Sequence, residues 1–351
     1  MKTYNSILIA TVCLIVGTCT GIILWAQPIS GDLTRIGAYP ERWFGWHAPQ
    51  QRIPDQANSE KSASKKHILV VGDSFSEAGR WQASLGDRYS FSFIHAKNTN
   101  IDKFVSRIER DKPDAVVVES VERFSLAMFG EGSQFMGRTT DTCPPATVHH
   151  SITTTTANNA VVEFPLYNRK TFPGSAKEIS QGFHYVKLWS EFLRKPKKQK
   201  AVILDLANDK LFSSQRNDQL LVIRDDLLLA PDLDEKTIRT VHCSMRSVAS
   251  RIAATGVAHA FLIVPDKTTA YQPFLVDEDI RQKRSVVERI VEADIPHMID
   301  MLPATRLALA VGEVDFYLPN DTHWGYKGFQ LAARLIDSEL QQQWATTGSR
   351  E

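Results

Sequence analysis

The chain has 351 residues, 43% of them hydrophobic, which is enough for one large domain or two small ones around a substantial core. Its formal net charge is +1, and no long basic or acidic block interrupts the sequence. Nucleic-acid binding needs a concentrated positive charge, so this class of partner is excluded. The composition is otherwise that of an ordinary globular protein.

The amino terminus carries an apolar stretch, "ILIATVCLIVGTCTGIILWA" at residues 7–26, that contains no charged residue and is long enough to cross a bilayer as a helix. A signal peptide cleaved near "WAQP" is the alternative, but its apolar core would be shorter and would end in a small-x-small site. We therefore expect an uncleaved signal anchor, with residues 1–6 as a short cytoplasmic tail and the rest of the chain outside.

Residues 27–64 are rich in Pro, Gly, Gln and Ser and are expected to form a stalk that partly packs on the following domain. From residue 65 to 345, apolar strand patterns alternate with amphipathic helix patterns. This alternation predicts an α/β fold, doubly wound, with a mostly parallel sheet covered by helices on both faces. The strands are expected at residues 67–72, 89–96, 114–121, 200–206, 258–265 and 297–301, and the helices after residue 73 through 81 and at 101–110, 234–255, 278–293 and 327–343.

A polar insertion around residues 129–200 interrupts this alternation, with some helix expected around 175–192. Its paired histidines, His149 and His150, have no carboxylate or third histidine at helical spacing, so we expect neither a metal site nor a cofactor. Beyond the apolar stretch the chain has two cysteines, Cys143 and Cys243. In an oxidising compartment they can form one disulfide, and two unrelated buried thiols are the alternative.

The first predicted strand of the domain runs directly into Gly72-Asp73-Ser74-Phe75 and then into a helix. In an open parallel sheet, ligands bind outside the carboxyl ends of the strands, which is where this serine lies. Ser74 is therefore either a nucleophile, whose own backbone N–H helps to hold an oxyanion, or a helix cap together with Asp73.

A nucleophilic serine needs a base, and "YLPNDTHWGYKGF" provides Asp321 and His323 just before the last predicted helix. A carboxylate two residues from a histidine can receive one imidazole N–H and leave the other ring nitrogen for the serine. The alternative is that both residues cap the last helix. A serine after the first strand combined with an Asp–His pair before the last helix is much rarer than either feature alone.

These two elements, Gly72-Asp73-Ser74-Phe75 and Asp321-Thr322-His323-Trp324, resemble those of the SGNH (GDSL-type) hydrolase superfamily. The D-x-H-W form is similar to the alginate O-acetyltransferase (AlgX/AlgJ-type) group, which acetylates exopolysaccharides in the bacterial periplasm. Two strand ends also resemble that group, "VVVESVERF" with Glu119 and Arg123, and "FLIVPDKTTAY" with Lys267 and Tyr271. The resemblance covers roughly residues 65–340.

The resemblance implies a Ser74–His323–Asp321 triad that transfers an acetyl group to a polysaccharide, with the donor supplied by a membrane-bound acyltransferase. It also implies a single-pass protein of the bacterial inner membrane with its catalytic domain in the periplasm. The candidate oxyanion or substrate-binding residues are Asp73, Glu119, Arg123, Lys267, Tyr271 and Trp324.

The sequence departs from the family at two points. The glycine and asparagine that usually donate to the oxyanion are missing, so Arg123 either replaces them or pairs with Glu119. The serine precedes the D-x-H element, whereas the alginate enzymes have the reverse order. A carbohydrate esterase or deacetylase, or a catalytically silent glycan-binding protein of an exopolysaccharide assembly complex, are the alternatives to a transferase.

Overall fold

The structure is a computed structural model that describes residues 2–26, 30–56, 58–59, 63–137, 143, 161–168, 200–228 and 234–348. Most of the expected insertion, including His149, His150 and the helix expected around 175–192, lies outside these residues.

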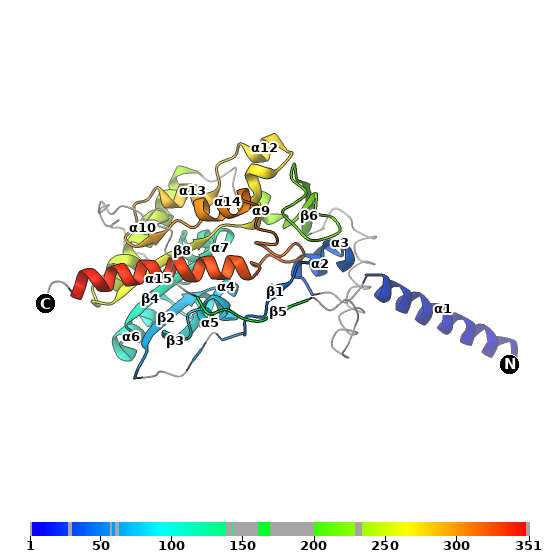
Figure 1. Cartoon of the computed structure of the whole chain (residues 1–351), viewed down its shortest axis with the longest axis horizontal. Coiled ribbons are helices and arrows are strands. Elements are labelled where there is room, and N and C mark those ends of the chain that lie inside the picture. Colours follow the sequence, from blue (N-terminus) through cyan, green and yellow to red (C-terminus); the bar gives the residue numbers. More distant parts are fainter. Residues whose placement is uncertain are drawn as a thin grey trace.

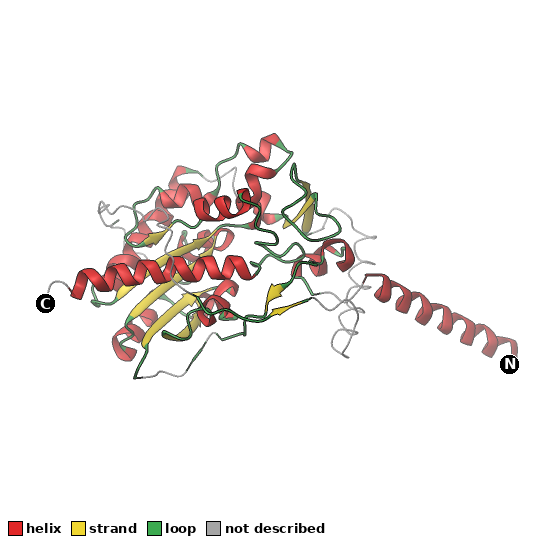
Figure 2. Ribbon diagram, in the orientation of Figure 1, coloured by secondary structure: helices red, strands yellow, loops and turns green. Residues whose placement is uncertain are grey.

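A five-stranded, fully parallel sheet forms the centre of the domain (Figure 2). Its strand order is β3-β2-β4-β8-β9. β4 is buried along its whole length and β2 along all but its first residue, as continuous apolar runs require when both faces of a sheet are covered. The predicted doubly wound α/β fold is thereby confirmed. The strands are β2 (Lys66–Gly72), β3 (Tyr89–His95), β4 (Ala115–Val121), β8 (Ala258–Val264) and β9 (Met298–Ile299).

Helices cover both faces of this sheet (Figure 1). On one face, Ile68 and Val70 of β2 pack in a core with α5 and the long carboxyl-terminal helix α15. On the other face, Leu69 and Val71 pack with α6, α7, α10 and α13. The bounds are α5 (Arg80–Ala83), α6 (Ile101–Asp111), α7 (Glu122–Phe129), α10 (Glu235–Ala253), α13 (Val286–Val291), α14 (Leu302–Ala310), which reaches both cores, and α15 (Tyr326–Gly348).

Two of the expected helices are divided in the structure. The helix after Asp73 is split into α4 (Ser74–Glu77) and α5 by Gly79, whose φ of 69° lies in the left-handed region that favours glycine. The helix expected over 278–293 is split into α12 (Glu278–Arg281) and α13, because Ser285 and Glu288 form a capping box that starts a new helix. Short elements complete the domain: η1 (Ala96–Asn98), α9 (Asp225–Leu228), α11 (Lys267–Tyr271) and η3 (Gln272–Phe274).

The apolar run at residues 200–206 forms a strand, but outside the central sheet. This strand, β6 (Ala201–Asp205), pairs antiparallel with β7 (Gln219–Ile223). Ala201 packs against the helices that precede the domain, whereas Val202 and Leu204 pack against the central core. Both faces of β6 therefore have apolar neighbours, although only Ala201 is fully buried, and this explains its apolar pattern.

The segment predicted as a stalk contains two short helices that pack on the β6–β7 hairpin. Leu33 of α2 (Asp32–Gly37) and Phe44 of α3 (Glu41–Phe44) are fully buried there. Farther along, β1 (Gln50–Gln51) pairs antiparallel with β5 (Leu166–Tyr167).

Helix α1 (Lys2–Ala26) projects away from the domain (Figure 1). Its stretch Thr3–Ile22 is long and apolar enough to cross a membrane and is not buried in the protein. At the domain end of the helix, the Trp25 ring lies edge-on to Trp43, and the Arg42 guanidinium lies 4.1 Å from the centre of the Trp25 ring.

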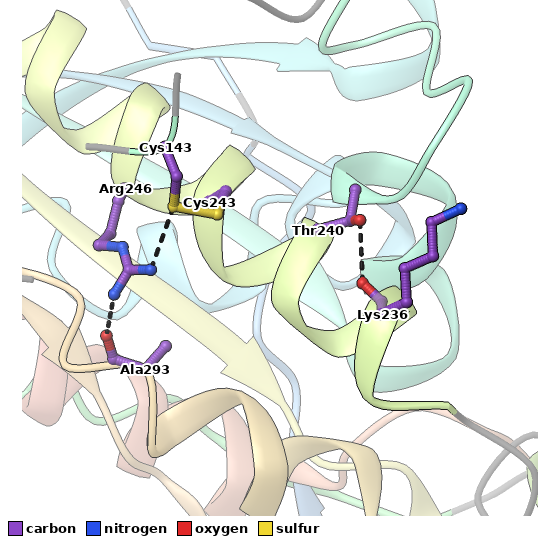
Figure 3. Close-up of a disulfide and its surroundings, with 6 residues drawn as sticks. All are labelled: Cys143, Lys236, Thr240, Cys243, Arg246 and Ala293. Atoms are coloured by element: carbon purple, nitrogen blue, oxygen red, sulfur yellow. Dashed lines mark hydrogen bonds between the residues drawn. A yellow bond between two sulfur atoms is a disulfide. The ribbon is translucent and has the colours of Figure 1, made fainter. Parts of the chain in front are cut away.

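A disulfide joins Cys143 to Cys243 on α10, so the structure has the bridge and not two free thiols (Figure 3). Arg246, one turn farther along α10, donates one hydrogen bond to Cys143 Sγ at 3.3 Å and another to the Ala293 carbonyl at 3.2 Å. The bridge thus fastens a residue of the expected insertion to α10, 100 residues farther along the chain.

Candidate active site

Ser74 is the first residue of α4, directly beyond the carboxyl end of β2. The N-cap of this helix is Asp73, whose carboxylate accepts hydrogen bonds from the backbone N–H of Phe75 at 3.0 Å and of Val121 at 2.7 Å. Because Asp73 performs the capping, the hydroxyl of Ser74 is available for another partner. Asp73 is therefore a structural residue at the strand ends and does not reach toward a substrate.

That partner is His323, which comes from the loop before α15. His323 Nε2 lies 3.0 Å from Ser74 Oγ, and His323 Nδ1 lies 2.7 Å from Asp321 Oδ1. Asp321 Oδ1 also accepts the backbone N–H of His323 at 3.0 Å. A carboxylate can only accept, so Nδ1 carries the proton and Nε2 is free to accept the serine proton. The structure thus assembles the three predicted residues from positions 249 residues apart.

The Asp–His pair also sets the protonation of the imidazole. Burial disfavours the charged form of His323, but the hydrogen bond and negative charge of Asp321 outweigh it and raise the pKa of His323 above 6.5. Burial likewise opposes the charge of Asp321, and the contacts with His323 overcome it and lower the pKa of Asp321 below its usual range. The pair is therefore built to stabilise an imidazolium, which a general base becomes during catalysis.

Aromatic side chains pack around the ring of His323. The Phe75 ring lies 4.8 Å from the His323 ring and 4.8 Å, edge-on, from the Trp324 ring. Trp324 is fully buried and also packs edge-on against Phe329 of α15. Trp324 is therefore packed behind Phe75, which contacts the ring of His323.

Lys267 and Tyr271, the other candidates carried by the resemblance, lie behind the loop of the Asp–His pair. The Lys267 amine donates to the carbonyls of Leu318, Pro319 and Asp321 at 2.8, 3.0 and 3.2 Å. Burial lowers the pKa of Lys267 to about 7, against the opposing charge of Asp321. Tyr271 is fully buried, and its hydroxyl accepts the backbone N–H of Tyr317. Both residues support the loop and neither faces a substrate.

Arg123 and Glu119 do not form an ion pair with each other. Arg123 instead pairs with Asp266 and lies 4.0 Å from Asp226. Its positive charge still reaches the site, where it lowers the pKa of His323. Glu119 accepts the backbone N–H of Asp73 at 3.1 Å and lies so close to Gly72 that a Cβ there would come within 2.4 Å of its carboxylate. Glu119 thus explains the glycine that precedes Asp73.

A fourth polar residue of the site, Asp32, was not expected from the sequence. Its carboxylate accepts from the backbone N–H of Thr322 at 2.9 Å and from the Thr322 hydroxyl at 2.7 Å. Asp32 lies 290 residues from Thr322, in the segment predicted as a stalk. No motif around Asp32 indicates this contact.

Asp32, Asp321 and His323 are the group of potential metal ligands that the described part of the chain brings together. Their atoms already serve hydrogen bonds, to Thr322 for Asp32, to His323 for Asp321 and to Ser74 for His323. The arrangement therefore fits a hydrogen-bonded triad with a supporting carboxylate.

An open groove, whose volume of about 430 Å³ includes open solvent, lies next to the loop that carries the Asp–His pair, but Ser74, Asp321 and His323 do not line it. Leu318 and Trp324, on either side of the pair, contribute to its wall. Its other walls include Arg80 and Tyr326, which are partly exposed, and Tyr167, which is exposed. Flat aromatic faces and polar side chains are a surface on which a sugar ring can lie.

The comparison with known families bears on the carboxyl-terminal part of the chain. Residues 217–351 match the family described as an SGNH hydrolase-like domain of the acetyltransferase AlgX. This range contains Asp321 and His323 but not Ser74, which joins them through the fold alone. The comparisons with curated proteins and with solved structures find no match. The predicted resemblance is thus confirmed over residues 217–351, which are similar to the SGNH hydrolase-like domain of AlgX.

Proposed function

We propose that this protein is a membrane-anchored periplasmic O-acetyltransferase that acts on an exopolysaccharide or another cell-surface glycan. The observation that carries the proposal is the assembled Ser74–His323–Asp321 triad. Its imidazole lies within hydrogen-bond distance of the serine hydroxyl on one side and of the carboxylate on the other. The match of residues 217–351 to an acetyltransferase domain favours transfer of an acetyl group over other acyl chemistry.

The reaction has two steps. In the first, His323 Nε2 takes the Ser74 proton while Ser74 Oγ attacks the acetyl carbonyl of the donor. His323 then gives the proton to the leaving group, and an acetyl-serine remains. In the second, His323 removes the proton of a sugar hydroxyl, whose oxygen attacks the acetyl-serine, and the proton returns to Ser74 as the acetylated sugar leaves. Asp321 holds the imidazole throughout.

Negative charge develops on the carbonyl oxygen in both steps. The backbone N–H of Ser74, at the start of α4, is one donor suited to this oxygen. Arg123 is held by Asp266, so its contribution is the positive charge that it places near the triad and not a directed hydrogen bond.

The groove lined by Leu318 and Trp324, next to the loop that carries the Asp–His pair, is the proposed site of the glycan acceptor. Its tyrosines, Tyr167 and Tyr326, offer ring faces to a sugar, and Arg80 offers hydrogen-bond donors. The donor acetyl group is proposed to come from a membrane-bound acyltransferase. Asp32 lies six residues after Ala26, the end of α1, and a stretch of this length spans about 20 Å when fully extended. A site this close to the membrane can receive a donor handled there.

The test is incubation of the full-length chain in detergent with an activated acetyl ester, with and without acceptor oligosaccharides, followed by mass analysis of protein and sugar. An acetyl-protein that passes its acetyl group to the oligosaccharide supports the proposal. Release of acetate alone, with acceptor present, would make the protein an esterase. A protein that never acquires an acetyl group would be a silent binding protein.

Ser74→Ala is the matched variant for this test. It removes the nucleophile but not the cap, since Asp73 caps α4, so its melting temperature should stay near that of the wild type while acetylation and ester turnover disappear. The control is Ser250→Ala, which removes an exposed hydroxyl on α10. Full turnover in Ser74→Ala would end the proposal.

A further inference from the structure

The segment between the membrane helix and the domain is hydrogen-bonded to the catalytic loop. We name residues 30–46 the juxtamembrane segment and residues 318–323 the Asp–His loop. Asp32 is the centre of the contact, because its carboxylate receives both the backbone N–H and the hydroxyl of Thr322. Thr322 lies between the two residues of the Asp–His pair, so Asp32 fixes the backbone from which both side chains extend.

The backbone of the same residue reaches Asp321 itself. The Asp32 N–H donates to Asp321 Oδ2 at 3.3 Å, while Asp321 Oδ1 receives His323 Nδ1. The two oxygens of Asp321 are thus held from opposite sides, one by the juxtamembrane segment and one by the catalytic histidine. Rotation of this carboxylate would break one of the two bonds.

The neighbouring Asn320 is held in the same way. Its carbonyl accepts the backbone N–H of Leu33 at 3.1 Å and of Thr34 at 3.4 Å. Its side-chain amide donates to Ser30 Oγ at 3.0 Å and to Glu41.

The fit between the two segments leaves no spare room. A Cβ on Gly31 would lie 2.0 Å from the Asn320 carbonyl oxygen, so the contact requires glycine there. Lys267 also donates hydrogen bonds to the Asp–His loop, so this loop is held by Lys267 as well as by the juxtamembrane segment. The contact is therefore specific and not a loose apposition of a linker.

We propose that Asp32 is a positioning residue of the reaction, which orients the Asp321–His323 pair toward Ser74 from the juxtamembrane segment. This inference rests on the proposed function of the triad. It assigns a catalytic contribution to a segment that the sequence predicts to be a stalk. Because Asp32 follows the end of α1, the contribution is the same whether α1 stays attached or is removed after Ala26.

The charge of Asp32 provides a readout that packing alone would not move. The groups that act on His323 are Asp321 and Asp32, which raise its pKa, and Arg123, which lowers it, while Ser74 faces its Nε2. The reaction needs neutral His323, so activity is lost as the pH falls through the pKa of this residue. Removing the charge of Asp32 lowers that pKa and moves the acid limb of the pH profile to lower pH.

The experiment measures acetyl-ester turnover by the full-length chain in detergent over a range of pH, for the wild type, Asp32→Ala and Asp32→Asn. We expect Asp32→Ala to lower kcat about 10–100-fold with little change in KM, the cost of a misoriented catalytic group. We expect Asp32→Asn, which keeps the shape of the side chain, to lose less kcat and to shift the acid limb to lower pH. The control is Asp87→Asn, which neutralises an exposed carboxylate before β3 and should change neither quantity.

Two further results separate this inference from the proposed function. If Ser74→Ala is inactive while both Asp32 variants keep the wild-type kcat and acid limb, Asp32 has no positioning role and the inference is wrong. If Ser74→Ala is fully active, the proposed function is wrong and the inference falls with it. If the melting curve shows that Asp32→Ala does not fold, the isosteric Asp32→Asn tests the inference through its kcat and the acid limb of its pH profile.

Discussion

The two halves of the candidate site are built in different ways. The serine half is local: β2 ends at Gly72, Asp73 caps α4, and Ser74 follows, with two hydrogen bonds between Asp73 and the neighbouring strand β4. The Asp–His loop has little secondary structure of its own and is held by residues from distant parts of the chain, above all Asp32 and Lys267. The nucleophile is thus positioned by a local strand–helix turn, whereas the histidine base is positioned by residues that are distant in the chain.

The largest effect should come from Asp321→Asn. The amide can turn its NH₂ group toward His323 Nδ1, which stabilises the wrong tautomer, and we expect kcat to fall about 10⁴-fold with a near-native melting temperature. Because Asp321 raises the pKa of His323, the residual activity of Asp321→Asn should also extend to lower pH than that of the wild type. Steady-state ester turnover against pH measures both effects, with Asp87→Asn as the control. Wild-type kcat in Asp321→Asn would remove the carboxylate from the mechanism.

The second effect tests the support of the loop. Lys267→Met keeps the length of the side chain but leaves the Leu318, Pro319 and Asp321 carbonyls without their donor. We expect a loss of about 2–4 kcal/mol in the free energy of unfolding. We also expect a fall in kcat of about 10–100-fold, because the Asp–His pair shifts.

Denaturant unfolding and ester turnover measure the two losses from Lys267→Met. Lys327→Met is the matched control, since the amine of Lys327 is partly exposed and 3.7 Å from Glu313. A stable Lys267→Met protein with full activity would show that the loop keeps its shape without the amine.

The third effect concerns stability alone. Cys143→Ser combined with Cys243→Ser removes a bridge that closes a chain segment of 100 residues, and should lower the free energy of unfolding by about 2–4 kcal/mol. Activity should stay close to that of the wild type, because the described contacts of the bridge run to Arg246 and not to the triad. Denaturant unfolding of both proteins without reductant measures the difference. Loss of activity in a folded variant would show that the bridge also positions the site.

The sequence predicts most of what is periodic or local. The parallel strands follow from continuous apolar runs, and the serine and the Asp–His pair follow from their places at strand and helix ends. The run of β6 has the same apolar pattern, because both of its faces contact apolar side chains, yet it pairs with β7 outside the sheet. The hydrophobic pattern of a strand alone does not predict the strand with which it pairs.

Contacts between residues that are distant in the chain leave no periodic or local pattern in the sequence. Asp32 resembles any acidic residue in the first turn of a helix, and its role depends on a loop 290 residues away. Arg123 and Glu119 are close in sequence and opposite in charge, yet Asp266 offers Arg123 a buried partner from the end of β8. Lys267 and Tyr271 lie at the expected strand end but point behind the loop, a direction set by packing and not by position in the chain.

The smallest effect should come from Glu119→Gln, on the serine half. Burial, reinforced by the charge of Asp73, raises the pKa of Glu119 well above its usual range, which favours the protonated form of this carboxyl. Glutamine has the shape of the protonated acid, and its carbonyl can still accept the Asp73 N–H. We expect turnover within about twofold of the wild type and a change in unfolding free energy below about 1 kcal/mol. Glu119→Ala is the contrasting variant, because it leaves the Asp73 N–H without an acceptor. It should lower the free energy of unfolding by about 1–3 kcal/mol. A Glu119→Gln protein that folds but loses its activity would mean that this carboxyl exchanges a proton in the reaction, and that the serine half is more than a rigid turn.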